Sequence, residues 1–109
     1  MKISLRILLL IVTLSTWGIC SQAEEVVGVK IEKMQFVPQN LVVKVGATVT
    51  WLNMEKRSNH SVFFQKEGLA ESDRLFPSEV WQRTFDKPGV YPYICGPHPD
   101  MTGIIEVTP

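Results

Sequence analysis

Apolar and polar residues alternate along much of the chain, and this alternation predicts short β-strands joined by turns. Three segments in the first half are rich in β-branched residues and read as strands: Val26–Glu32, Leu41–Val45 and Thr48–Asn53. In the third of these, Val49 and Trp51 share one face, which we expect to be buried. Pro38 predicts a sheet edge or a corner between the first two strands.

The second half continues the same pattern with little sign of helix. Four further segments are predicted to be strands: Ser61–Gln65, Glu79–Phe85, Val90–Cys95 and Thr102–Thr108. The stretch 66–78 lacks alternation and predicts an irregular excursion, with one helical turn at 69–73. Seven to eight short strands with turns between them favour an all-β fold, an antiparallel Greek-key β-sandwich, in a single domain.

The first 23 residues differ from the rest and predict a secretory signal peptide. Lys2 and Arg6 give a positive start, an apolar run follows, and Ser21-Gln22-Ala23 offers small residues for cleavage. An uncleaved membrane anchor is the alternative, but the uncharged stretch 7–20 is short for a membrane span. We therefore expect a signal peptide over 1–23 and a mature domain over 24–109.

Removal of this segment changes both the charge and the cysteine count. The full chain has 11 Lys+Arg and 11 Asp+Glu, so the mature part carries 11 − 2 = 9 basic residues and a formal charge of −2. No basic stripe remains to bind nucleic acid. Cys95 becomes the only cysteine, which in an oxidising compartment is a liability unless a metal or burial protects it.

A thiol, an imidazole and a thioether follow one another near the C-terminus, at Cys95, His98 and Met101. Thiolate and thioether favour copper(I), and imidazole suits both copper oxidation states. His60 is the only other histidine, and it would complete a trigonal plane of two histidines and one cysteine with a weak axial methionine, the ligand set of blue-copper sites. A structural zinc site is the alternative, but it needs no axial thioether.

The segment between the cysteine and the methionine looks built to keep its shape. Pro97 and Pro99 fix φ on both sides of His98, and Gly96 and Gly103 are expected to permit tight turns at the two ends. Such a loop would keep ligand geometry nearly constant when a bound metal changes oxidation state.

At these positions the chain resembles the cupredoxins, the small blue-copper proteins, and most closely their amicyanin and pseudoazurin branch. The resemblance covers nearly the whole mature chain. In the first half it lies in Phe36-Val37-Pro38, Leu41-Val42-Val43, Gly46, Val49, Trp51 and Asn53. In the second half it lies in Pro88-Gly89, Tyr91, Tyr93, Cys95, Pro97, His98, Met101 and Gly103, with a short Cys-x2-His-x2-Met loop like that of amicyanin.

The resemblance implies a cupredoxin-like sandwich that holds one type 1 copper ion. Cys95 would supply the thiolate, His60 and His98 the imidazole nitrogens, and Met101 a longer axial bond. The implied function is a monomeric periplasmic electron carrier that is not an enzyme. It would pass single electrons between redox proteins, such as a periplasmic dehydrogenase or a cytochrome c, that dock near His98.

One departure from the family pattern concerns the residue after the first histidine. Many cupredoxins have asparagine there, where it ties the two ligand loops together, whereas this chain has Ser61. A copper storage or delivery protein is the alternative function. The chain has none of the methionine- or histidine-rich tracts that such proteins often carry, and this favours the electron carrier.

Overall fold

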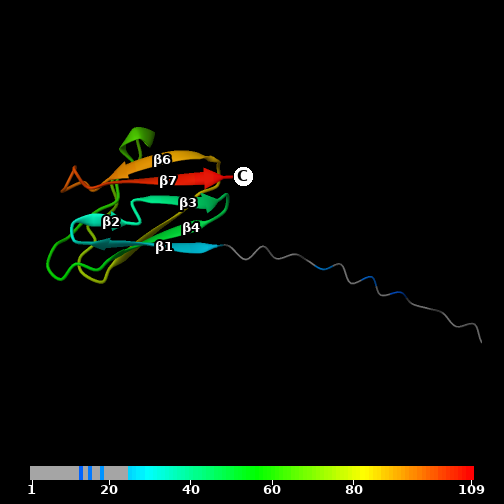
Figure 1. Ribbon diagram of the computed structural model, residues 1–109, viewed down its shortest axis with the longest axis horizontal. Helices are drawn as coiled ribbons and strands as arrows, with labels where there is room; N and C mark the ends of the chain where they lie inside the picture. The colour runs from blue at the N-terminus through cyan, green and yellow to red at the C-terminus, as the bar shows by residue number, and fades with distance from the viewer. Residues whose placement is uncertain (1–12, 14, 16–17, 19–24) are drawn as a thin grey trace, which may run out of the picture.

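The computed structural model describes residues 13, 15 and 18 and the continuous stretch 25–109, so the predicted signal peptide, apart from those three residues, and its predicted cleavage site lie outside the described residues. Within 25–109, seven strands form two sheets that face each other (Figure 1). The four-stranded sheet has the order β2 (Gln35–Val37), β1 (Val26–Glu32), β4 (Thr48–Asn53) and β5 (Val80–Thr84). The three-stranded sheet has the order β3 (Asn40–Lys44), β7 (Thr102–Thr108) and β6 (Gly89–Ile94).

The predicted all-β sandwich is confirmed, and the direction of two strand pairs refines it. β1 with β2, β4 with β5, and β6 with β7 run antiparallel. β1 with β4 and β3 with β7 run parallel, so each sheet is mixed and the expectation of purely antiparallel sheets does not hold for these two pairs. Strands that are distant in sequence become neighbours in this way, and the parallel partners need long connections between them.

The core lies between the two sheets and follows the alternation of the sequence. β7 alternates exposed and buried residues along most of its length, and in β4 both Val49 and Trp51 are fully buried. The ring of Trp51 meets Tyr93 edge-on at 5.4 Å and Phe64 edge-on at 6.0 Å, between centroids. Trp51 belongs to β4 and Tyr93 to β6, so this aromatic cluster joins the two sheets. Burial of each such side chain contributes about 1.5–3 kcal/mol to the stability.

The expected strand at Ser61–Gln65 is wrong. Within it only Phe63 forms an isolated bridge, with Ile94, and His60 just before it forms another, with Leu75. Residues 60, 61 and 62 are all buried, because protein covers both sides of the segment, and its backbone pairs with a different neighbour at each step. An apolar run of this kind has the composition of a strand without its regular ladder.

The helical turn was also placed wrongly at 69–73. A 3-10 turn lies earlier, at η1 (Gln65–Glu67), and Gly68 ends it with a left-handed φ of 68°. No helix in the described part of the chain has the length and apolar character needed to span a membrane. Residues 71–75 instead run beside 60–62, with a hydrogen bond from the N–H of Ser72 to the carbonyl of Val62.

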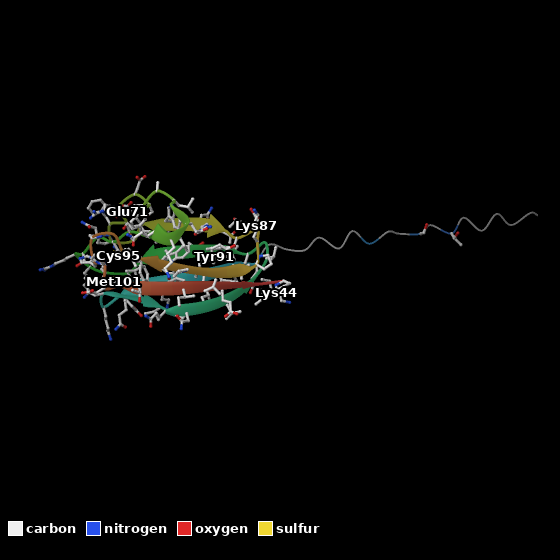
Figure 2. All side chains as sticks on the ribbon, turned by 90° about the horizontal axis from the view of Figure 1, so that it is seen from above. Lys44, Glu71, Lys87, Tyr91, Cys95 and Met101 are labelled. Carbon is white, nitrogen blue, oxygen red and sulfur yellow. The ribbon has the colours of Figure 1, made fainter. Side chains whose placement is uncertain are left out.

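The loops that carry the candidate ligands gather at one end of the sandwich. Figure 2 shows Glu71, Cys95 and Met101 toward this end, and Lys44 and Lys87 toward the opposite end. The ligand end is where β4 leaves for the His60 loop and where β6 turns into β7.

Candidate metal centre

His60 is held in the interior by backbone pairing with the segment that runs beside it. Its N–H donates to the carbonyl of Leu75 at 3.1 Å, and its carbonyl accepts from the N–H of Leu75 at 2.7 Å. The residue is fully buried. The backbone bonds fix where the residue lies, and the atoms packed around its buried side chain limit its rotamers, so the ring is presented in one direction.

Asn53, at the end of β4, organises the loop that leads to His60. Its side-chain amide donates to the carbonyls of Ser58 at 2.9 Å and Leu75 at 2.8 Å. Its side-chain oxygen accepts from the N–H of Glu55 at 2.9 Å. Asn53 is fully buried, so these bonds satisfy groups that would otherwise be costly to remove from water.

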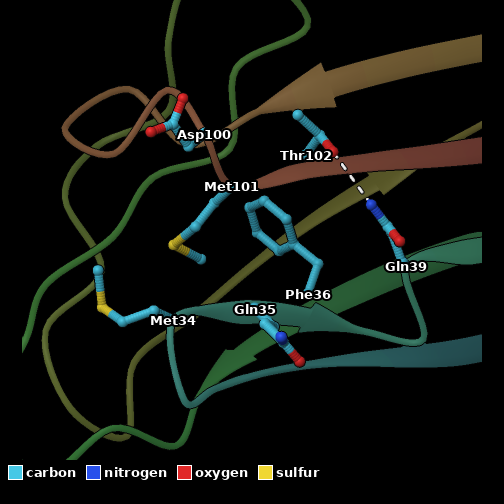
Figure 3. A pocket seen from close by; sticks show the side chains of 7 residues that line it. All are labelled: Met34, Gln35, Phe36, Gln39, Asp100, Met101 and Thr102. Carbon is cyan, nitrogen blue, oxygen red and sulfur yellow. Dashed lines mark hydrogen bonds between the residues drawn. The ribbon is translucent and has the colours of Figure 1, made fainter.

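The C-terminal ligand loop closes on itself through its backbone. The N–H of Cys95 donates to the carbonyl of Met101 at 3.0 Å, and the N–H of Met101 donates to the carbonyl of His98 at 2.9 Å. Met101 is 6 % exposed, and Figure 3 shows its side chain beside Phe36 at a pocket of about 270 Å³. The thioether is thus turned inward and not toward solvent.

The two histidines meet the cysteine with the same nitrogen. Nδ1 of His60 and Nδ1 of His98 each lie 3.6 Å from Sγ of Cys95, and the three candidate ligand atoms lie within 4.8 Å of one another. A metal in a trigonal plane, with bonds of about 2.0 Å to nitrogen and about 2.3 Å to sulfur, separates nitrogen from sulfur by about 3.7 Å. The residues therefore fit a thiophilic metal such as copper.

The electrostatic setting keeps His60 neutral. Burial, and next the neighbouring His98, hold the pKa of His60 below its usual value, while Glu55 opposes them. Nε2 of His60 lies 3.3 Å from a carboxylate oxygen of Glu55, close enough for attraction but without the geometry of a well-formed hydrogen bond. A proton on Nε2 leaves the lone pair on Nδ1 facing the sulfur, as metal binding requires.

The glycines of the ligand loop have a role different from the one expected. Neither Gly96 nor Gly103 has a positive φ, so the prediction that they permit tight turns is wrong. A Cβ at Gly103 would collide with the ring of Tyr93, which lies across from it in the β6–β7 pair. These glycines provide space for neighbouring side chains.

The surface over the ligand loop is mostly apolar. His98 is partly exposed, unlike His60 and Cys95, which are fully buried. A shallow hollow of about 420 Å³ beside it is lined by Met34, Pro97, His98, Pro99, Asp100 and Met101. Met34 was not expected at this surface, whereas Met101 lies mostly beneath it.

Residues 23–108 match the family model described as copper binding proteins of the plastocyanin/azurin family. The chain belongs to the cupredoxins. This membership confirms the predicted family and the predicted cofactor, one type 1 copper ion, and the function is that of a blue-copper electron carrier.

Relatives and solved structures point to the same branch of the cupredoxins. Amicyanin-alpha of Methylorubrum extorquens is 39% identical over 83 residues, which covers 72% of this chain and 69% of that protein. Amicyanin of Paracoccus denitrificans is 36% identical over 97 residues, covering 85% and 73% respectively. The Cu(I) structure of a methionine-to-alanine variant of amicyanin matches with a TM-score of 0.73 and 35% identity, over 81% of this chain and 87% of that one.

The sequence did not reveal the roles of three residues near the site. Asn53 was noted only as part of the cupredoxin pattern, and no role was predicted for Glu55, which lies beside His60, or for Glu71, which accepts from the hydroxyl of Ser61. Periodicity gives no sign of these roles, because the partners of all three come from other segments of the chain.

Proposed function

We propose that His60, Cys95, His98 and Met101 hold one copper ion, and that the protein carries single electrons between redox proteins of the periplasm. The observation that carries this proposal is the equal 3.6 Å separation of both Nδ1 atoms from Sγ of Cys95. Bound copper supplies the one-electron chemistry, and the protein keeps the ligands in place in both oxidation states.

The burial of the ligands favours a carrier over an enzyme. His60 and Cys95 are fully buried, and Met101 is 6 % exposed. Four protein ligands leave no coordination position for a substrate, whereas catalytic metal sites keep one open. Buried ligands also exclude water, which limits the solvent rearrangement that accompanies a change of charge.

The electron path leads through His98, the partly exposed member of the ligand set. The apolar surface formed by Met34, Pro97 and Pro99 around it suits brief contact with another redox protein, because weak electron-transfer complexes have small interfaces. The partner class is a periplasmic dehydrogenase or a cytochrome c, and the carrier itself is a monomer. This role rests on the resemblance to amicyanin.

The periplasmic location rests on the pattern of residues 1–23. A positive start, an apolar run and small residues before Glu24 support export and cleavage. The mass of the protein purified from the periplasm tests this: cleavage leaves a chain that begins at Glu24. An intact N-terminus in a membrane fraction would instead support a retained anchor.

The copper site is tested by adding one equivalent of copper(II) to the purified mature protein. We expect an intense visible band from thiolate-to-copper charge transfer that is complete at one copper per chain. Cys95→Ser should abolish the band. Met101→Leu should change the potential, while the matched variant Met54→Leu should not, because Met54 is 47% exposed. A colourless complex would contradict the proposal.

The carrier differs from a copper-delivery protein in how firmly it holds the metal. A closed site predicts reversible voltammetry and slow loss of copper to a competing chelator. Rapid exchange of copper, without a reversible couple, would favour delivery.

A further inference from the structure

Ser61, which stands where many cupredoxins have asparagine, sits at the centre of a small hydrogen-bond network. Its hydroxyl donates to Oε1 of Glu71 at 2.6 Å, and Oγ of Ser61 in turn accepts from the N–H of Gly96 at 2.8 Å. Its backbone N–H donates to Sγ of Cys95 at 3.4 Å. One residue therefore touches the metal-binding thiol, the residue after it, and a carboxylate from a third segment.

The missing side chain at Gly96 makes room for this carboxylate. A Cβ built at Gly96 would collide with Oε1 of Glu71, and it would lie 2.8 Å from Oγ of Ser61. The small residues at 61 and 96 and the acid at 71 thus form a matched set. Any side chain at 96 would drive Glu71 away.

Glu71 is held in place by the segment to which it belongs. Next to it, the hydroxyl of Ser72 accepts from the N–H of Val62 at 2.8 Å, and the N–H of Ser72 donates to the carbonyl of Val62 at 3.0 Å. The guanidinium of Arg74 is 3.8 Å from the same carboxylate oxygen of Glu71, too far for a hydrogen bond. The close contact of that oxygen is therefore the hydroxyl of Ser61.

The carboxylate decides which way the Ser61 hydroxyl points. A serine hydroxyl has one proton and can rotate freely. When that proton goes to Glu71, a lone pair faces the N–H of Gly96. Hydrogen bonds to a charged acceptor are stronger than neutral ones, so Glu71 fixes this orientation and with it the separation of the two ligand segments.

We propose that Glu71 is a positioning residue for the copper site and acts through Ser61. Together they form the tie between the His60 and Cys95 segments that asparagine is expected to make in many cupredoxins. The pair holds the N–H of Ser61 on the sulfur of Cys95. Hydrogen bonds to a ligating thiolate tune the reduction potential of the metal site. The effect on the potential rests on the proposed function, whereas the tie itself exists in the copper-free protein.

The test compares Glu71→Ala with Glu71→Gln in the mature copper-loaded protein. Both variants remove one negative charge, but glutamine keeps an oxygen that can accept from Ser61. The reduced site carries more negative charge on sulfur, so losing the donor to sulfur should lower the potential. We expect Glu71→Ala to have a lower potential than Glu71→Gln, with a shifted charge-transfer band. Asp73→Asn, which removes an exposed charge of the same segment, controls for charge alone.

Ser61→Ala provides the coupling control. Without the hydroxyl, replacement of Glu71 by alanine or by glutamine should give the same potential, because no group remains to be oriented. Equal potentials of the two Glu71 variants in the presence of Ser61 would overturn the proposal.

Hydrogen exchange of the Gly96 amide in copper-free protein gives a second readout that does not depend on the metal. Loss of the orienting bond should speed this exchange by about three- to tenfold in Glu71→Ala relative to Glu71→Gln. Equal rates would overturn the tie. A wild-type protein that shows no blue band would contradict the proposed copper site, while the exchange rates would still decide the Ser61–Glu71 tie.

Discussion

Replacing Asn53 by alanine is expected to destabilise the copper-free protein strongly. The side chain is fully buried and makes three hydrogen bonds, to the carbonyls of Ser58 and Leu75 and from the N–H of Glu55. At about 1 kcal/mol for each net hydrogen bond, the loss is about 3 kcal/mol of unfolding free energy. The two carbonyls and the N–H that lose their partner inside the protein add a desolvation cost, so the loss of unfolding free energy should not be smaller than this.

Two further variants give this prediction its contrast. Asn53→Asp has the same shape and keeps the acceptor for Glu55, but it turns oxygen toward two carbonyls and should cost at least as much as alanine. Asn59→Ala is the control, because Asn59 makes one long hydrogen bond of 3.5 Å, to Arg74 near the surface. Its loss should be under about 0.5 kcal/mol.

Urea unfolding of the copper-free proteins, followed by tryptophan fluorescence, measures the three losses directly. The denaturation midpoint should fall in the order Asn59→Ala, Asn53→Ala, Asn53→Asp. If Asn53→Ala and Asn59→Ala unfold within about 0.5 kcal/mol of each other, the reasoning that Asn53 organises the His60 loop is refuted.

Two more predictions concern packing and pH. Gly103→Ala places a methyl group against the ring of Tyr93 and should cost about 1–3 kcal/mol in the same unfolding assay, while an unchanged midpoint would show that the ring moves away freely. Burial holds the pKa of His60 below its ordinary value of 6.5, so the unfolded chain binds the proton more readily. The contribution of His60 to the stability of the copper-free protein is therefore fully present above about pH 6.5 and is lost as the pH falls below it. His60→Gln should flatten this part of the dependence, and an unchanged slope would exclude His60 as its source.

Most of the fold could be predicted because its strands follow simple alternation. The boundaries of β4 and β7 agree with the segments predicted, since each has one buried and one exposed or half-buried face. The segment Ser61–Gln65 failed because it is covered on both sides, and a run of buried residues looks the same in sequence whether or not it forms a ladder. The two parallel pairs were missed because alternation carries no information about the direction of a partner strand.

The candidate ligands could be found because their chemistry is concentrated in few residues. The chain has two histidines and, after residue 23, one cysteine, so few metal sites are possible. The residues that support the ligands could not be found in this way. Asn53 and Glu71 act on backbone and hydroxyl groups that the fold brings beside them, and such contacts leave no periodic trace.

X-ray absorption at the copper edge of the protein loaded with one equivalent of copper tests the central claim most directly, because it reports the atoms bound to the metal. The geometry of Cys95 with His60 and His98 predicts one short sulfur bond and two imidazole nitrogens at about 2.0–2.3 Å. Coordination by nitrogen and oxygen alone, with no sulfur, would contradict the claim that these three side chains converge on copper.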